Sequence, residues 1–221
     1  MELLLNNWVY ICVAMGACVA GWLIPKWKAL SAPERISWLF IVVLAVHIFE
    51  EYTCPGGFVW AFGTAAGSTN PLSAPLNRLT TMITNVGAMV VFIMLAWKWA
   101  NRPWMLIAIA IFDLLQLIMH TAFGVISMQY CSWLHVPYSP GLANSVLMML
   151  PLAIACIVVL RREHMLRGHG GKFVVGQILL GLVVDIVVVV ALIAVPVNLL
   201  GNDVNSPYAF PDAGFYQREL E

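Results

Sequence analysis

Charged residues are scarce in this chain. Asp, Glu, Lys and Arg make up 10% of its 221 residues, whereas an ordinary soluble domain contains about 25%. Hydrophobic residues reach 62%, which exceeds what the core of a soluble protein can absorb. No run of Lys and Arg interleaved with aromatic residues is present and the formal net charge is zero, so nucleic acid is excluded as a partner. The missing charge indicates that the chain lies in a lipid bilayer.

Long apolar runs, separated by Pro and Gly, fill most of the chain. They do not alternate with polar residues, which excludes a transmembrane β-barrel, and about 20 apolar residues in a helix are enough to cross a bilayer. We therefore predict an all-α fold, a polytopic transmembrane helical bundle that forms one transmembrane domain over residues 1–221. The first run is expected to be retained as a span, because no positive residue precedes it. The predicted spans cover residues 5–25, 36–53, 77–97, 104–128, 142–160 and 173–200.

Lys and Arg are missing from every second connection between these spans. Residues 54–76 and 129–141 contain neither, whereas residues 26–35, 98–102 and 161–172 contain nine of the eleven in the chain. Because short cytoplasmic loops are enriched in positive residues, both termini are predicted to lie outside. In a bacterium the expected location is the cytoplasmic (inner) membrane, with the termini in the periplasm.

The two connections predicted to lie outside carry no charged residue. Residues 54–76 combine Gly, Ala, Ser and Thr with aromatic residues, a composition that can fold over a site. We expect this connection and residues 129–141 to cap the polar side chains described next. Each contains one cysteine, Cys54 and Cys131, and spacing alone does not decide between a disulfide and two free thiols.

Ionisable side chains are rare within the predicted spans. Each needs a partner or a function, because burying one at mid-bilayer costs at least about 2.5–3.5 kcal/mol. His47, Glu50 and Glu51 stand at i, i+3 and i+4 near the end of the second span, so they share one helix face. With a rise of about 1.5 Å per residue, Asn85 on the third span and His120 on the fourth fall at the depth of His47. These side chains are predicted to converge in the outer leaflet.

Two aspartates, Asp113 and Asp185, are predicted to lie deeper, near the bilayer midplane. We expect them to form hydrogen bonds across neighbouring helices as part of the structure. The alternative is that they continue a path for ions or protons inward from the outer cluster. The cytoplasmic half of every predicted span is almost entirely apolar, which disfavours such a path.

The outer cluster is suited to two kinds of chemistry. As a metal site, His47, Glu51 and His120 would bind a divalent ion such as zinc, with water as the fourth ligand and Glu50 as a general base. As an acid/base site, the same side chains would exchange protons without a metal. A structural role is the third possibility, since Glu50 and Glu51 lie near a helix end, where water can solvate them and Arg78 can pair with one of them.

Several motifs of the outer cluster fall in order along the predicted helices. They are HIFEEY at residues 47–52, Asn85, His120 and YSPG at residues 138–141. Together they resemble the HXXEE-domain family of bacterial membrane proteins, over roughly residues 36–150. Thr is common in that family at the position of Asn144, so the polar side chain is kept here but the hydroxyl is not. The resemblance implies a shared site and no particular reaction.

These observations favour a membrane enzyme acting on a lipid-like or isoprenoid-like substrate that enters from the outer leaflet. The reaction would be metal-assisted hydrolysis, or an isomerisation or cyclisation by acid/base catalysis. The alternative is a non-enzymatic carrier or sensor that binds a metal ion or proton, although six spans without inverted repeats are poorly suited to alternating access. The candidate catalytic residues are Glu50, His47, His120 and Glu51, and the candidate substrate-binding residues are Asn85, Tyr138 and Asn144.

Overall fold

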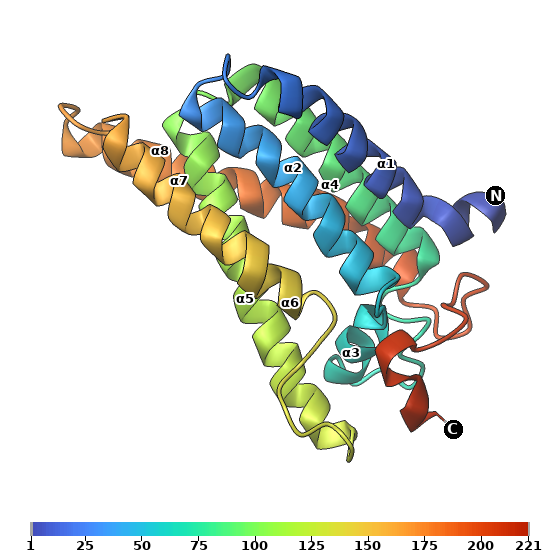
Figure 1. Cartoon of the computed structure of the whole chain (residues 1–221). Helices are drawn as coiled ribbons and strands as arrows, with labels where there is room; N and C mark the ends of the chain where they lie inside the picture. The colour runs from blue at the N-terminus through green and yellow to red at the C-terminus, as the bar shows by residue number, and fades with distance from the viewer. Residues whose placement is uncertain (1, 221) are drawn as a thin grey trace.

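The computed structural model describes residues 2–220, of which no residue lies in a strand, and 74% is helix. Six helical segments are long and apolar enough to span a membrane, so the predicted six-span, all-α fold is confirmed (Figure 1). The spans are α1 (Glu2–Lys26), α2 (Ala32–Tyr52), α4 (Arg78–Trp99), α5 (Pro103–Tyr130), a fifth over Leu142–Arg162 and a sixth over Gly171–Gly201.

The last two spans contain π-helical turns within their α-helical length. The fifth span consists of α6 (Leu142–Asn144), η1 (Ser145–Met149) and α7 (Leu150–Arg162). The sixth span consists of α8 (Gly171–Val189), η2 (Val190–Ala194) and η3 (Val197–Gly201). Two shorter helices, α3 (Phe58–Ala65) and the 3-10 helix η4 (Gly214–Glu219), lie outside the spans.

The start of α2 shows how local chemistry sets a helix boundary. The sequence predicts this span from residue 36, but the helix begins at Ala32. Ser31 caps it, because its side chain accepts from the Glu34 backbone N–H while the Glu34 carboxylate accepts from the Ser31 N–H at 2.8 Å. This capping box, with Pro33 in the first turn, extends the helix beyond its apolar residues.

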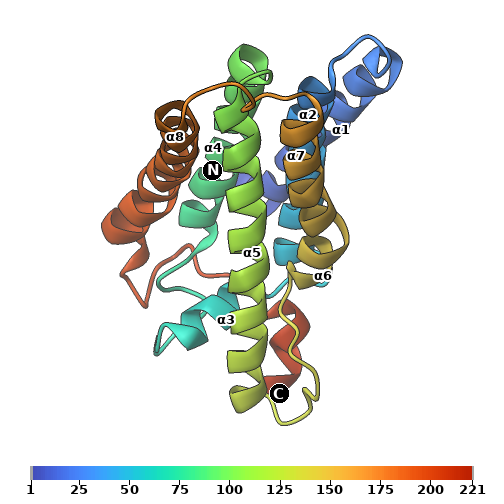
Figure 2. The ribbon, with the colours of Figure 1, turned by 90° about the vertical axis from the view of Figure 1, so that its left-hand side faces the viewer.

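The spans run up and down, so the chain turns at two opposite ends of the bundle. The short connections α1–α2, α4–α5 and α7–α8, which carry most of the Lys and Arg, lie together at one end (Figure 2). Both ends of the described chain lie towards the other end, and the C-terminal segment lies beside α3 (Figure 1). The position of both ends at the same end of the bundle agrees with the predicted topology. The compartment that this end of the bundle faces stays a prediction.

The end opposite the Lys and Arg connections is closed by three chain segments, which we call the cap: residues 54–76, residues 129–141 and the C-terminal residues 202–220. The first two were expected to cover the site, whereas the contribution of the third was missed. It is fixed by backbone hydrogen bonds from Phe210 N–H to Leu72 O, at 2.8 Å, and from Phe215 N–H to Gly56 O, at 3.2 Å.

A small apolar cluster holds the cap segments together. Trp60 stacks on Tyr216 with ring centroids 4.6 Å apart, and Cys131 is buried in the same cluster. Cys54, in contrast, is exposed, and both cysteines are free thiols. Of the two states that the sequence left open, the structure therefore favours two free thiols. The two loops are joined by apolar and aromatic packing and not by a disulfide.

Candidate functional site

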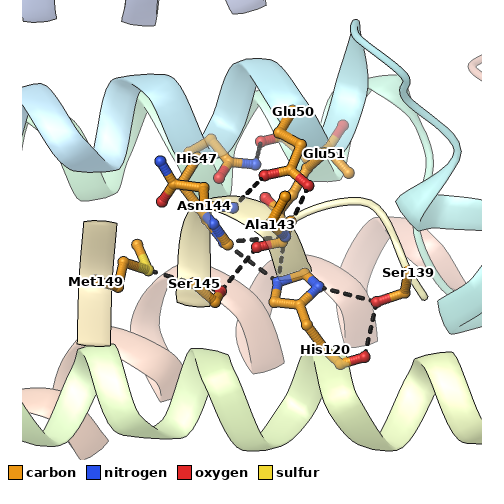
Figure 3. Close-up of polar contacts among 12 residues, drawn as sticks. His47, Glu50, Glu51, His120, Ser139, Ala143, Asn144, Ser145 and Met149 are labelled. Carbon is orange, nitrogen blue, oxygen red and sulfur yellow. Dashed lines mark hydrogen bonds and ion pairs between the residues drawn. The ribbon is translucent and has the colours of Figure 1, made fainter. Parts of the chain in front are cut away.

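Three predicted site residues, His47, Glu51 and His120, converge just below the cap (Figure 3). The Nε2 atom of His120 lies 3.2 Å from His47 Nε2 and 3.2 Å from Glu51 Oε1, and His47 Nε2 lies 3.5 Å from the same Glu51 oxygen. The residues are 1%, 4% and 0% exposed. We call these residues the trio. Three donor atoms thus meet at one point that is closed to bulk solvent.

The positions of the trio follow from two helices. His47 and Glu51 stand one turn apart on α2, which brings their side chains together on the face that is turned towards α5. His120 approaches from α5, where its ring packs against Phe58 of α3 at a centroid distance of 5.1 Å. The predicted equal depth of His47 and His120 therefore corresponds to direct contact.

A glycine makes room for the His120 ring. Gly141 has φ +102, and a Cβ built on it would lie 2.3 Å from His120 Cε1 and 2.6 Å from Nε2. Such distances are shorter than any real Cβ contact, so the residue at position 141 must be glycine for the ring to occupy this place. The YSPG motif thus forms one wall of the site, through its backbone.

Glu50 does not join the trio, although it precedes Glu51 directly. Its Oε1 accepts from the Tyr138 hydroxyl at 3.0 Å. The same oxygen accepts from Ala143 N–H at 3.1 Å, and Oε2 accepts from Asn144 N–H at 2.7 Å (Figure 3). The two N–H groups belong to the first turn of the fifth span, which has no intrahelical partner for them. Glu50 of α2 therefore caps another helix and fixes it beside the trio.

Of the three candidate substrate-binding residues, two form hydrogen bonds with Glu50 and the third, Asn85, bonds within its own helix. Tyr138 and Asn144 both bind Glu50 and do not contact the trio through any hydrogen bond found within residues 2–220. Burial and the neighbouring Glu50 carboxylate raise the pKa of the Tyr138 phenol, which keeps it a hydrogen-bond donor. Asn85 is buried on α4, and its side-chain amide donates to Thr81 O of the same helix at 2.9 Å.

Arg78 does not neutralise Glu50 or Glu51. Its guanidinium forms an ion pair with Glu2 at 2.9 Å, donates to Asn6 and donates to Pro207 O at 3.2 Å. It therefore ties the start of α4 to the start of α1 and to the C-terminal segment. The alternative in which Arg78 explains the carboxylates of the site is wrong.

Sequence reasoning missed Ser139 and Phe58, which both contact His120. Ser139 is fully buried, and its Oγ lies 3.2 Å from His120 Nδ1 and 2.9 Å from His120 O. The signal for Ser139 was present in the YSPG motif, which places it two residues before Gly141. Phe58 is one of the aromatic residues of 54–76 that were expected to fold over the site, but its contact with His120 depends on α3, a helix within a segment that was predicted to be a loop.

The geometry of the trio fits a small divalent cation. In a tetrahedral site with bonds of about 2.0–2.2 Å to nitrogen and oxygen, neighbouring donor atoms are separated by about 3.3–3.6 Å. The three separations in the trio are 3.2, 3.2 and 3.5 Å. Two imidazoles and a carboxylate are also a donor set that zinc accepts, so His47, Glu51 and His120 could hold such an ion.

A cavity of about 640 Å³ opens between α1, α3, α4 and the C-terminal segment. Tyr52 and Thr53, the two residues that follow Glu51, line it, and Trp8, Val9 and Phe210 add apolar surface. Its polar lining comes from Glu2, Asn6, Arg78 and Asp212. The lining of the cavity therefore combines apolar and charged side chains.

Asp113 and Asp185 form a second buried acidic group, on α5 and α8. The two helices run in the same direction and touch where a Cβ on Gly181 would lie 3.1 Å from Ala108 N. Both aspartates lie about one turn beyond this contact, so they are at the same level. Neither carboxyl group has a hydrogen-bond partner in the described part of the chain, so the expected hydrogen bonds across helices are not formed.

Comparison with known proteins gives a family and no activity. No curated protein and no solved structure matches the chain. Residues 38–156, which include the whole trio and the YSPG motif, match the family described as "Protein of unknown function with HXXEE motif". In this chain His47, Glu50 and Glu51 are the motif. The chain therefore belongs to the HXXEE family.

Proposed function

We propose that this protein is a metal-dependent membrane enzyme whose ion is bound by His47, Glu51 and His120. The observation that carries the proposal is the mutual approach of three donor atoms, with separations of 3.2, 3.2 and 3.5 Å. A hydrogen bond joins one donor to one acceptor, whereas a cation at the centre satisfies three lone pairs at once. A tetrahedral ion with three protein ligands keeps one position for water or substrate, as catalytic zinc sites do.

The ion would act as a Lewis acid on a water molecule or on a substrate oxygen, which is the chemistry of metal-assisted hydrolysis. The residues around it have separate tasks. Glu51 supplies the negative charge of the ligand set. Glu50, predicted as a general base, has both carboxylate oxygens occupied by hydrogen bonds, so we assign it the task of holding Tyr138 and the fifth span in place.

The substrate class proposed is a lipid-like or isoprenoid-like molecule. Support comes from the cavity of about 640 Å³, which is lined by apolar residues such as Trp8, Val9 and Phe210 and by the charged residues Glu2, Arg78 and Asp212. A long apolar molecule could place its tail along the spans and its polar end under the cap. Movement of Tyr52, which lines the cavity and directly follows Glu51, would connect the cavity to the trio.

Two other functions make different predictions. Acid/base catalysis by the trio would need no metal. A carrier or sensor would bind the ion reversibly, and a carrier would also need a polar path through the bilayer. In the part of the chain that the structure describes, no hydrogen bond links the trio to Asp113 or Asp185, which favours an enzyme over a carrier.

Metal analysis of purified protein tests the proposal. We expect about one zinc or similar ion per wild-type chain after purification in detergent and exposure to zinc, and much less for His47→Ala. His135→Ala removes an exposed histidine of the cap and is the matched control, for which the metal content should not change. Wild-type protein that binds no divalent ion would reject the metal site and leave the acid/base alternative. Equal metal content in His47→Ala and wild type would place any ion elsewhere.

A further inference from the structure

Among the described residues, Ser139 is the only hydrogen-bond partner of the Nδ1 atom of His120. Its Oγ lies 2.9 Å from the His120 carbonyl oxygen and 3.2 Å from His120 Nδ1. It is fully buried, and Figure 3 shows this cap residue beside His120 of α5. One hydroxyl thus contacts both the backbone and the ring of the same residue.

The direction of these two hydrogen bonds follows from the number of hydrogens. A serine hydroxyl has one hydrogen, and a carbonyl oxygen can only accept, so the hydroxyl donates to His120 O. The lone pairs of Oγ then face Nδ1, and this second contact is a hydrogen bond only when Nδ1 carries a hydrogen. In a neutral imidazole the other nitrogen, Nε2, is then free of hydrogen.

We propose that Ser139 is a positioning residue that selects the His120 tautomer with a free lone pair on Nε2, the atom that points at His47 and Glu51. This inference rests on the proposed metal site, because a lone pair at this atom is what a metal ligand requires. Metal-bound histidines usually donate their second N–H to a carboxylate, a carbonyl or water, which fixes both the tautomer and the ring orientation. Here the serine hydroxyl takes that place.

The two histidines of the trio differ in this respect. His47 Nδ1 is buried and has no hydrogen-bond partner within residues 2–220. A hydrogen on His47 Nδ1 would therefore have no acceptor, so we place the hydrogen on His47 Nε2. From there it donates to His120 Nε2 at 3.2 Å. In the metal-free protein, His120 therefore already has a free lone pair on Nε2 that can bind an ion. His47 must first move or lose the hydrogen on its Nε2.

Removing the hydroxyl should change the tautomer. In Ser139→Ala the Nδ1–H of His120 would be buried without an acceptor, which disfavours that tautomer. The hydrogen would move to Nε2, where it can donate to Glu51 Oε1 at 3.2 Å and would block the ligand position. Ser139→Thr keeps a hydroxyl, and Ser127→Ala is the matched control, because it removes a buried hydroxyl that binds Tyr216 and not a histidine.

The experiment combines a tautomer measurement with a binding measurement. The ¹⁵N NMR shifts of ¹⁵N-histidine-labelled, metal-free protein in nanodiscs report which ring nitrogen of His120 is protonated, with His120→Gln used for assignment. Competition with a zinc-chelating dye gives the zinc affinity. We expect Nδ1–H in wild type, Nε2–H in Ser139→Ala with about 10–100-fold weaker zinc binding, recovery in Ser139→Thr and no change in Ser127→Ala.

Each outcome bears on the two proposals separately. Nε2–H in wild-type His120, or an unchanged tautomer in Ser139→Ala, would overturn the role of Ser139 even if zinc binds. A change of tautomer in Ser139→Ala without zinc binding by any variant would support the role of Ser139 and reject the metal site. If Ser139→Ala fails to fold, the wild-type spectrum still decides, because Nε2–H there contradicts the inference.

Discussion

The trio and the Asp113–Asp185 pair are both buried groups of ionisable side chains that involve α5, but their surroundings differ. Around the trio the neighbours are specific: Gly141 leaves room for the His120 ring, and Ser139 binds it. Around the aspartates, no hydrogen bond reaches any carboxyl oxygen from the described chain. Burial alone therefore does not distinguish a site, whereas side chains held by several partners do.

The largest effect is expected in an experiment that asks which side of the membrane the cap and the trio face. Native Cys54 is exposed in the cap, so a membrane-impermeant maleimide should label it on intact cells if the cap faces outside, as the distribution of Lys and Arg predicts. Cys54→Ser should abolish the label. Arg167→Cys in that background should react only after permeabilisation. Reversed labelling would place the trio in the cytoplasmic leaflet, whereas the predicted depth of the aspartates would not change.

Gly141→Ala should damage the trio more than any other single-methyl change. The added Cβ has no room beside the His120 ring, and a non-glycine residue at positive φ costs about 1–2 kcal/mol in addition. Gly168→Ala is the matched control, because Gly168 also has positive φ but no atom within 4 Å of its Cβ. Zinc content and thermal unfolding should both fall for Gly141→Ala, whereas Gly168→Ala should lose only a little stability. Equal zinc binding in the two variants would show that the ring position is not critical.

Much of this contrast could be predicted from the sequence. The rise along the spans placed His47, Asn85 and His120 at one depth and Glu51 a turn higher, and the structure brings His47, Glu51 and His120 into contact. The destination of Glu50 could not be predicted, since its partners include backbone N–H groups, which every residue except proline has. The C-terminal part of the cap was also missed, because its contacts are backbone hydrogen bonds and aromatic packing between segments far apart in the chain.

Neighbouring glutamates should respond in opposite ways to the same acid-to-amide change. Glu50→Gln replaces an oxygen that accepts backbone hydrogen bonds at a helix start, so it should cost about 1.5–3 kcal/mol of stability and lower the melting temperature. Glu51→Gln should instead lose bound zinc, with a smaller effect on unfolding. Differential scanning fluorimetry and metal analysis of the two variants measure both effects. Zinc loss in Glu50→Gln without a change in melting temperature would give Glu50 a direct role at the ion.

The smallest effect is expected at the two aspartates that are predicted to lie near the bilayer midplane. Asp113→Asn and Asp185→Asn are also acid-to-amide changes, but no hydrogen bond from the described chain is lost when either carboxyl group is replaced. We therefore expect unchanged zinc content and a change in stability of less than about 1 kcal/mol, compared with Glu50→Gln as the sensitive control. The two variants should be measured singly and together, because an amide at one position can form a hydrogen bond with the carboxyl group at the other. Loss of zinc from any of them would connect the midplane to the trio and would favour a carrier, since only a path through the bilayer gives distant aspartates a share in ion binding.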